Sequence, residues 1–324
     1  MQWAQPQVRA PRDGRHHVRI LVVGAGSTGG YFGGRLAQAG RDVTFLVRPA
    51  RAAALRDKGL RIVSPYGDAT LAPQLVTADA LTQHFDAVLL TVKAFGLDAA
   101  LEDMAPAVGP DTMILPVLNG MRHVDRLIER FGRRAVAGCV CKVATIVDAE
   151  GRIVQLNRLQ DLAYGEMDGA RSARMERLDA AMQGAGFPAR LSPDIAAEMW
   201  EKWDMLAALG AITCLMRGPV GEVNAAPGGT AFILRLLDEV VAVVTAEGHP
   251  PRPAFLVEAC KLLTDPTSTQ TSSMYRDLQQ GRPIEAEQIV GDMVARGARH
   301  QLAMPLLSAA FAHLSVYQTQ LAKR

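Results

Sequence analysis

One stretch near the N-terminus constrains the fold of this 324-residue chain more than any other. Residues 18–48 read VRILVVGAGSTGGYFGGRLAQAGRDVTFLVR, and the apolar, β-branched run that opens this stretch ends at a Gly-x-Gly-x-x-Gly pattern. An Ala/Leu-rich segment then continues to Gly40, and a second apolar run covers residues 42–47. This order predicts a strand, a glycine turn, a helix and a second strand, which is the unit that binds the pyrophosphate of a dinucleotide.

Each glycine of the turn has its own predicted task. Gly24 permits the tight turn, Gly26 lets the backbone approach the pyrophosphate, and Gly29 lets the helix pack closely on the strand. Free N–H groups at the start of the helix would then face the phosphates. The residues predicted to bind the cofactor in this turn are Gly24, Ala25, Gly26, Ser27, Thr28 and Gly29.

The position about 20 residues beyond the turn distinguishes NAD sites from NADP sites. An NAD site places Asp or Glu there to bind the ribose hydroxyls, whereas this chain has Arg48 at the end of the second strand and Arg51 close behind it. Arginine suits a 2′-phosphate, so the sequence predicts NADP(H) as the cofactor. The alternative, a glycine turn with an unrelated surface arginine, is disfavoured by the complete strand–helix–strand context.

Composition excludes several other classes of protein. Hydrophobic residues make up 49% of the chain and the formal net charge is +2, so we expect a large core and no surface for nucleic acid. No apolar stretch reaches the roughly 18 residues that span a bilayer. Residues 1–17 are polar, lack the apolar run of a signal peptide, and are expected to form a mobile tail. The 4 cysteines fit neither a disulfide framework nor a metal site, which favours free thiols in a reducing cytoplasm.

Strand and helix signals continue to alternate after the first unit. Residues 86–92 and 112–118 have the composition of buried parallel strands, so the pattern predicts a doubly wound, Rossmann-type α/β sheet. Lys93 and Asn119 directly follow these strands. Because ligands bind beyond the carboxyl ends of such strands, both residues are expected on the same rim as the glycine turn.

The pattern changes from residue 135 onward. Alternating segments predict antiparallel edge strands in AVAGCVCKVATIV, RIVQL and DLAYG, with a short helix over 171–183. After residue 192 only helical periodicity remains, so we expect an NADP-binding domain over 18–191 and an all-helical substrate domain over 192–324. The predicted helical segments are 194–216, 229–247, 253–263, 285–299 and 304–322.

The first of these helices carries a lysine in its apolar stripe. Ser192 and Asp194 give a helix start signal, and at 100° per residue Lys202 shares a face with apolar side chains. A lysine there is either an active-site acid with a lowered pKa or a side chain that reaches from the stripe toward Glu198, and periodicity alone favours the second. The apolar neighbours are Ile195, Met199, Leu206 and Leu209; the adjacent polar face holds Asp194, Glu198, Glu201 and Asp204.

A second group of polar residues lies near the C-terminus. It reads Ser272-Ser273-Met274, then Asp277, Gly281 and Glu285. Taken alone, Glu285 is an ordinary acid in the first turn of a helix after Pro283, and the serines are loop or cap residues.

Together these motifs resemble the ketopantoate reductase family (2-dehydropantoate 2-reductases), which are NADPH-dependent proteins with a 6-phosphogluconate-dehydrogenase-like fold. The resemblance runs from about residue 18 to the C-terminus. Besides the glycine turn and Arg48, it rests on Thr91-Val92-Lys93, Leu118-Asn119-Gly120, Trp200-Glu201-Lys202, Ser272-Ser273-Met274, Asp277 and Glu285.

The resemblance implies a role for each matching residue. Lys202 would be the general acid, Glu285 would hold the substrate and the lysine, and Ser273 would bind the substrate. Lys93 and Asn119 would lie between cofactor and substrate, and with Glu285 they would contact both the NADP(H) and the 2-oxo acid. No metal is implied.

Three positions depart from the family pattern. Where characterised members have asparagines, this chain has Leu206, Gly210 and Val220. A site that hydrogen-bonds a substrate hydroxyl discriminates strongly against analogues that lack the hydroxyl, and loss of the amides removes this discrimination. We therefore expect an apolar and roomier surface at the far end of the substrate.

The leading functional hypothesis is an NADPH-dependent reductase of ketopantoate, acting in pantothenate biosynthesis, or of a related 2-oxo acid. One alternative is an opine-type or amino-acid dehydrogenase that reduces an imine, and another is a noncatalytic NADP(H)-binding sensor. A lysine acid paired with Glu285 argues against the sensor. A homodimer is compatible with all three, and the sequence leaves the oligomeric state open.

Overall fold

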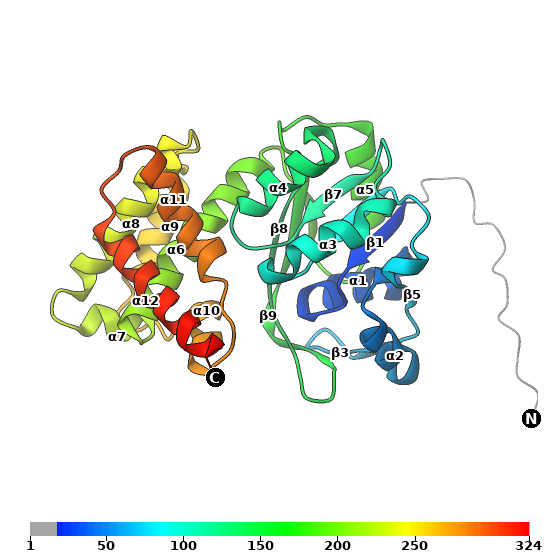
Figure 1. Ribbon diagram of the computed structural model, residues 1–324, viewed down its shortest axis with the longest axis horizontal. Helices are drawn as coiled ribbons and strands as arrows, with labels where there is room; N and C mark the ends of the chain where they lie inside the picture. The colour runs from blue at the N-terminus through cyan, green and yellow to red at the C-terminus, as the bar shows by residue number, and fades with distance from the viewer. Residues whose placement is uncertain (1–17, 324) are drawn as a thin grey trace, which may run out of the picture.

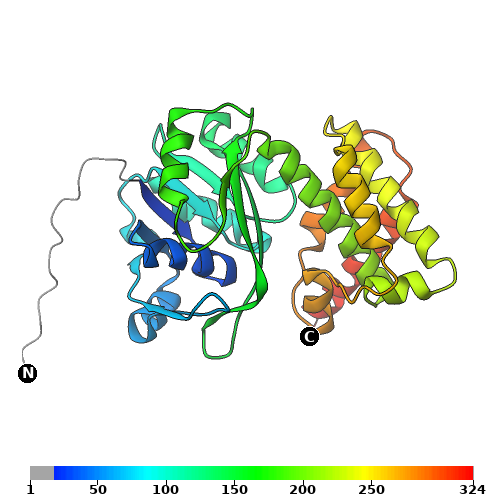
Figure 2. The same cartoon turned by 180° about the vertical axis from the view of Figure 1, so that it is seen from behind.

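The computed structural model describes residues 18–323, and the expected tail over residues 1–17 lies outside them. The described chain forms a sheet-containing domain followed by a helical domain (Figure 1). Seen from behind, helix α6 (Ile195–Met216) runs from the first domain into the second (Figure 2). Within residues 18–323, no helix is both long and apolar enough to cross a lipid bilayer.

The first sheet has five parallel strands in the order β5-β2-β1-β6-β7. The order reverses between β1 and β6, and a dinucleotide binds beyond the carboxyl ends of strands at such a reversal. This confirms the predicted doubly wound, Rossmann-type sheet. Its strands are β1 (Arg19–Val23), β2 (Asp42–Leu46), β5 (Gln74–Val76), β6 (Ala87–Leu90) and β7 (Met113–Pro116).

Helices connect these strands and cover the sheet. They include α1 (Ser27–Gln38), α2 (Pro49–Lys58), α3 (Leu97–Met104) and α4 (Arg122–Phe131). Short 3₁₀ turns are η1 (Ala78–Ala80), η2 (Ala94–Gly96), η3 (Ala105–Ala107) and η4 (Arg133–Ala135).

A second sheet corrects the prediction of simple antiparallel edge strands. Its order is β10-β9-β3-β4, and β8 pairs antiparallel with β9, whereas β10 and β3 run parallel to β9. RIVQL and DLAYG belong to one strand. They read as two segments in the sequence because residues 156–159 loop out at a register shift opposite β8 and interrupt the apolar pattern. The elements are β3 (Leu60–Val63), β4 (Ala69–Leu71), β8 (Ala137–Val147), β9 (Ile153–Glu166), α5 (Ala173–Met182) and β10 (Ala189–Leu191).

The helical domain contains the five predicted segments and two short helices that the periodicity missed. The missed helices are α7 (Val220–Ala225) and α10 (Ser273–Gln279), which are too short for a helical period to emerge. The predicted segment 285–299 opens with a π-helical turn, η5 (Glu287–Gly291), before α11. The other helices are α8 (Gly229–Ala246), α9 (Pro253–Leu263), α11 (Asp292–Arg299) and α12 (Pro305–Ala322).

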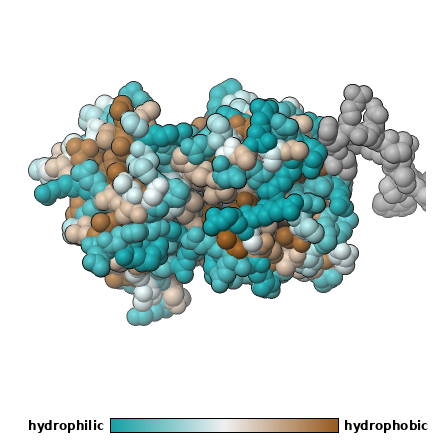
Figure 3. Space-filling view, turned by 90° about the horizontal axis from the view of Figure 1, so that it is seen from above, coloured by the Kyte–Doolittle hydropathy of each residue, from teal (hydrophilic) through white to brown (hydrophobic). Residues whose placement is uncertain are grey.

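One apolar core joins the two domains through α6. It extends from one face of the first sheet, through Trp203, to the helices around α8. Figure 3 shows hydrophobic residues gathered near the middle of the upper face, where the domains meet. Two of the four acids on the predicted polar face of α6 are buried, where α8 and α9 pack on the helix: Asp204 is fully buried, and Glu201 is buried against Arg252 at 2.7 Å.

Candidate active site

The glycine turn has the geometry that its sequence predicts. Gly24 has a φ of +96°, which favours glycine, and a Cβ on Gly29 would lie only 2.1 Å from the Thr91 hydroxyl oxygen. A Cβ on Gly26 would meet nothing within 4 Å, so the outer side of the turn is open. Thr91, which donates to the Gly24 carbonyl at 3.0 Å, fixes the turn from β6.

The start of α1 is suited to an anion. Gly26 is the N-cap residue, no side chain caps the helix, and the first turn contains no acid. The N–H groups that begin at Ser27 and Thr28 therefore lack side-chain acceptors within the described residues, and the positive end of the helix dipole is uncompensated. This end fits the pyrophosphate of a dinucleotide.

The two arginines beyond β2 differ in their surroundings. Arg48 is exposed at the start of α2, and its guanidinium has no hydrogen bond or ion pair with any residue of 18–323. Arg51 is half-buried, and its guanidinium donates to the Ala25 carbonyl at 3.0 Å. Burial lowers the pKa of Arg51. Arg51 thus holds the glycine turn, and Arg48 is available to a phosphate.

The loop after β6 contacts two acids of the helical domain. The Lys93 ammonium lies 3.2 Å from the Asp277 carboxylate, and the N–H of Ala94 donates to Glu285 at 2.9 Å. Glu285 therefore caps the 3₁₀ turn η2 of the other domain, which is a different role from that of a first-turn acid in its own helix. Lys93 and Glu285 lie together on the rim between the domains.

Lys202 lies on α6 and is half-buried in a pocket between the domains. Glu198, the alternative partner considered from the sequence, is instead bound by Arg190 at 2.7 and 2.8 Å and by Ser192 at 2.6 Å. Among residues 18–323 the Lys202 ammonium has no hydrogen-bond or ion-pair partner, so it is available to a ligand. The pocket is otherwise lined by Leu118, Gly120, Cys139, Val140, Met199 and Trp203.

The two titratable groups whose pKa Lys202 affects, His123 and Cys139, are both uncharged. Burial, and secondarily Lys202, lowers the pKa of His123 to about 3, so its imidazole is neutral. Burial raises the pKa of the Cys139 thiol, which Lys202 only partly opposes. The described residues place no anionic side chain beside Lys202, so its positive charge would favour an anionic substrate there. Sequence reasoning missed His123, although it lies only four positions beyond Asn119.

The turn that carries Asn119 rests on the helical domain. Gly120 has a φ of +85°, and a Cβ there would lie 2.5 Å from the Gln288 carbonyl oxygen. In the same π-helical turn, the Ile289 carbonyl accepts a hydrogen bond from the Trp203 indole at 3.0 Å. Asn119 and Lys202 are therefore each next in sequence to a residue that contacts this turn.

The two serines before α10 have separate positions. Ser272 is buried as the helix N-cap, where its hydroxyl accepts from the Tyr275 N–H at 3.0 Å and bonds Thr213 at 2.9 Å. Ser273 is exposed at the first residue of α10. Ser272 is thus structural, whereas the hydroxyl of Ser273 has no hydrogen-bond partner among residues 18–323 and is available to a substrate.

The residues that replace the expected asparagines give an apolar surface but less room than predicted. A Cβ on Gly210 would lie 2.8 Å from the Met274 methyl, so Met274 already fills the space beside Gly210. Leu206 is half-buried, and Val220 is fully buried, with its N–H bonded to the Gln270 carbonyl at 3.0 Å. Beside Gly210, the Met274 methyl thus occupies room that the missing amide was expected to leave.

The predicted residues form three groups. The glycine turn and Arg48 line the carboxyl edge of the first sheet, Lys93 and Glu285 lie on the rim, and Asn119 approaches the helix that carries Lys202. A direct contact between Lys202 and Glu285, implied by the family resemblance, is absent among residues 18–323.

A Rossmann-type sheet with an open glycine turn, followed by a helical domain that presents a lysine between the domains, is typical of NAD(P)-dependent oxidoreductases. Comparison with family models agrees: residues 20–169 match "Ketopantoate reductase PanE/ApbA", and residues 194–318 match "Ketopantoate reductase PanE/ApbA C terminal". The chain belongs to the ketopantoate reductase family.

Individual relatives cover nearly the whole chain. An uncharacterized oxidoreductase of Bacillus subtilis, YkpB, is 34% identical over 94% of this chain and 100% of its own. A 2-dehydropantoate 2-reductase of Mesorhizobium japonicum is 30% identical over 91% and 96%. The crystal structure of a ketopantoate reductase from Ralstonia eutropha superposes with a TM-score of 0.83 at 26% identity, covering 94% and 99%. D-mandelate dehydrogenase with NADH and anilino(oxo)acetate has the same TM-score at 19% identity over 94% and 99%, which shows a shared fold alone.

Proposed function

We propose that this protein is an NADPH-dependent reductase of a 2-oxo acid. The observation that carries the proposal is Lys202: a half-buried ammonium in an interdomain pocket, without an anionic partner among the described residues. The family to which the chain belongs supports the oxidoreductase chemistry. We also propose that the two domains meet near residue 192, with the Rossmann-type domain over 18–191 and the substrate domain over 192–324.

NADPH is proposed over NADH because Arg48, at the end of β2, is exposed and uncommitted to other described residues. The open side of Gly26 and the uncapped start of α1 fit the pyrophosphate. When bound, NADPH would supply a hydride to the ketone carbon. The chain's own residues then provide orientation, charge and a proton.

Lys202 performs the central step in this proposal. As negative charge develops on the carbonyl oxygen, the Lys202 ammonium stabilises it and donates a proton to it. The neutral imidazole of His123 leaves that positive charge uncompensated before the substrate arrives. Asn119 and Glu285 orient the reactants, and Ser273 binds the substrate from the start of α10.

The substrate proposed first is 2-dehydropantoate, reduced to pantoate in pantothenate biosynthesis, because several relatives bear that name. A more apolar 2-oxo acid is the second candidate, favoured by Leu206 and by the contact of Met274 with Gly210. Anilino(oxo)acetate, the compound present with D-mandelate dehydrogenase, is a further 2-oxo compound to include in the substrate panel below.

Steady-state oxidation of NADPH with a panel of 2-oxo acids tests the proposal. If the apolar surface at Leu206 and Met274 contacts the substrate, as the second candidate requires, kcat/KM for 2-oxoisovalerate and longer branched acids should equal or exceed that for 2-dehydropantoate. Because each buried methylene contributes about 0.8 kcal/mol, selectivity among these acids should be shallow. A preference for 2-dehydropantoate of tens of fold would overturn the apolar assignment. Turnover that requires ammonia or an amino acid would favour imine reduction, and NADPH binding without any turnover would favour a sensor.

A further inference from the structure

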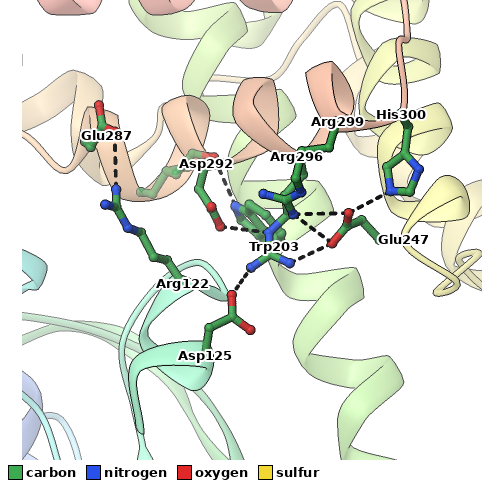
Figure 4. Close-up of polar contacts among 10 residues, drawn as sticks. Arg122, Asp125, Trp203, Glu247, Glu287, Asp292, Arg296, Arg299 and His300 are labelled. Carbon is green, nitrogen blue, oxygen red and sulfur yellow. Dashed lines mark hydrogen bonds and ion pairs between the residues drawn. The ribbon is translucent and has the colours of Figure 1, made fainter. Parts of the chain in front are cut away.

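Arg296, on α11 of the helical domain, is almost completely buried yet reaches the Rossmann-type domain (Figure 4). Its Nε donates to Asp292 at 3.0 Å and its Nη1 donates to Glu247 at 2.7 Å. Its Nη2 donates to Asp125, which belongs to α4 of the Rossmann-type domain. One guanidinium therefore links both domains.

The three carboxylates have different surroundings. Side-chain exposure is 9% for Asp292 and 12% for Glu247, but 62% for Asp125. The two buried acids compensate the buried charge of Arg296, and an ion pair to an exposed acid typically contributes little to stability. The contact with Asp125 therefore fixes the orientation of the domains more than it stabilises either one.

The same guanidinium packs on the two tryptophans that flank Lys202 in α6. Its central carbon lies 5.5 Å from the ring centre of Trp200 and 5.4 Å from that of Trp203. The two indole rings also contact each other, with centres 5.3 Å apart. Any shift of Arg296 thus acts on the helical turn that presents Lys202.

The surrounding contacts join this arginine to the loop that carries Asn119. Helix α11 continues directly from the π-helical turn, whose Gln288 carbonyl abuts Gly120. A second interdomain ion pair, Arg122 to Glu287 at 3.2 Å, lies beside it. The first turn of α4 and the segment 287–296 therefore form one interdomain contact (Figure 4). On one side of it the chain leads back to Asn119, and on the other side the contact reaches Trp203, the neighbour of Lys202 in sequence.

We propose that Arg296 is a positioning residue, which through its ion pair with Asp125 and its contact with both tryptophans fixes Lys202 relative to the Asn119 loop. This inference rests on the proposed role of Lys202 as proton donor. Arg296 acts through packing and has no contact with the reacting atoms.

The substitution Asp125→Asn tests the proposal without unpairing a buried charge. We expect kcat to fall about 5- to 20-fold, because small displacements of a reacting group are costly, while the affinity for NADPH and the midpoint of thermal unfolding stay unchanged. Asp125→Glu, which keeps the carboxylate, should retain most of the activity. Asp98→Asn is the matched control, since exposed Asp98 of α3 pairs at 2.9 Å with Arg126 of α4, an ion pair within one domain.

Tryptophan fluorescence gives a readout that is independent of turnover. In a Trp3→Phe background, the only tryptophans left are Trp200 and Trp203. Asp125→Asn should change their emission because Arg296 shifts over the rings, whereas Asp98→Asn should leave it unchanged.

The outcomes separate this inference from the proposed function. If the wild-type protein reduces 2-oxo acids and Asp125→Asn keeps kcat within twofold, the positioning role is refuted even though the proposed function stands. If the wild-type protein has no such activity, the proposed function fails, and unchanged emission in Asp125→Asn then refutes the coupling between Asp125, Arg296 and the tryptophans.

Discussion

The carboxylate of Glu285, in the helical domain, accepts a hydrogen bond of 2.9 Å from the backbone N–H of Ala94, in the loop after β6. The two residues are 191 positions apart in sequence and lie in different domains. The bond therefore forms only when the two domains are held close together. Glu285 therefore belongs to the rim of the cleft, next to the ion pair of Lys93 with Asp277.

Substitution of Glu285 should affect substrate binding more than cofactor binding. Glu285→Gln keeps the acceptor oxygen but loses the charge, and a charged hydrogen bond contributes about 1.5–3 kcal/mol. We expect KM for the 2-oxo acid to rise roughly tenfold while the Kd for NADPH changes less than threefold. The reverse pattern, measured by steady-state kinetics and calorimetry, would assign Glu285 to the cofactor or to local structure alone.

Cofactor preference should depend on Arg48, the N-cap residue of α2, and hardly on Arg56 within that helix. The native protein should bind NADPH roughly tenfold or more tightly than NADH, because an arginine–phosphate contact is charge-assisted. Arg48→Asp should invert this order, as measured by calorimetry with both cofactors. Arg56→Asp makes the same charge change at another exposed position of α2 and should leave the preference intact. Equal affinity of the native protein for both cofactors would contradict the assignment of Arg48 to the 2′-phosphate of NADPH.

The side chain of Met274 should limit the length of the substrate. Met274→Ala removes the methyl that fills the space beside Gly210, so longer apolar tails should gain relative to short ones. We expect the ratio of kcat/KM for a longer branched 2-oxo acid to that for 2-oxoisovalerate to rise about fourfold per methylene accommodated. Any loss of folded enzyme cancels in this ratio. An unchanged ratio would place the substrate away from Met274.

Stability should depend on pH through Asp204. This residue is fully buried, its carboxylate oxygens have no hydrogen-bond partner among the described residues, and burial together with nearby Glu201 raises its pKa to about 8. The folded state thus holds a proton that the unfolded state loses near pH 4, so this group lowers the free energy of unfolding as pH rises from about 4 to about 8.

Asp204→Asn should remove that dependence. Near pH 4 the variant and the native protein should be similarly stable, because each then buries a neutral group. At pH 8 the variant should be more stable by on the order of 2–4 kcal/mol. Urea unfolding at both pH values measures this, and a constant difference between the two proteins across the range would contradict the raised pKa.

Local signals in the sequence predicted much of the fold. The first strand–turn–helix–strand unit follows from glycines at fixed spacing. Asp194 is the N-cap of α6, and its side chain accepts a hydrogen bond from the Ala197 N–H, as the start signal predicts. The helices α7 and α10 were not predicted because they are too short to show a helical period. Strand β9 was predicted as two strands because its middle loops out at a register shift.

Interdomain contacts could not be read from the sequence. The bond between Asp125 and Arg296 joins residues 171 positions apart, and no local pattern announces it. The same reason explains why Met274 was not expected beside Gly210, and why helical periodicity gave no sign that Glu201 and Asp204 of the polar face of α6 are buried. Such contacts depend on how elements pack, which a single sequence does not encode in its local periodicity.

The turnover of Lys202→Ala tests the central claim most directly. We predict that kcat on the best 2-oxo acid falls by about 10²- to 10⁴-fold, because the variant loses both the proton donor and the charge that stabilises the oxyanion, while NADPH binding stays nearly intact. Lys261→Ala, at an exposed lysine of α9, is the control and should keep wild-type turnover. If Lys202→Ala also turns over at the wild-type rate, Lys202 is not the proton donor and the proposed mechanism is wrong.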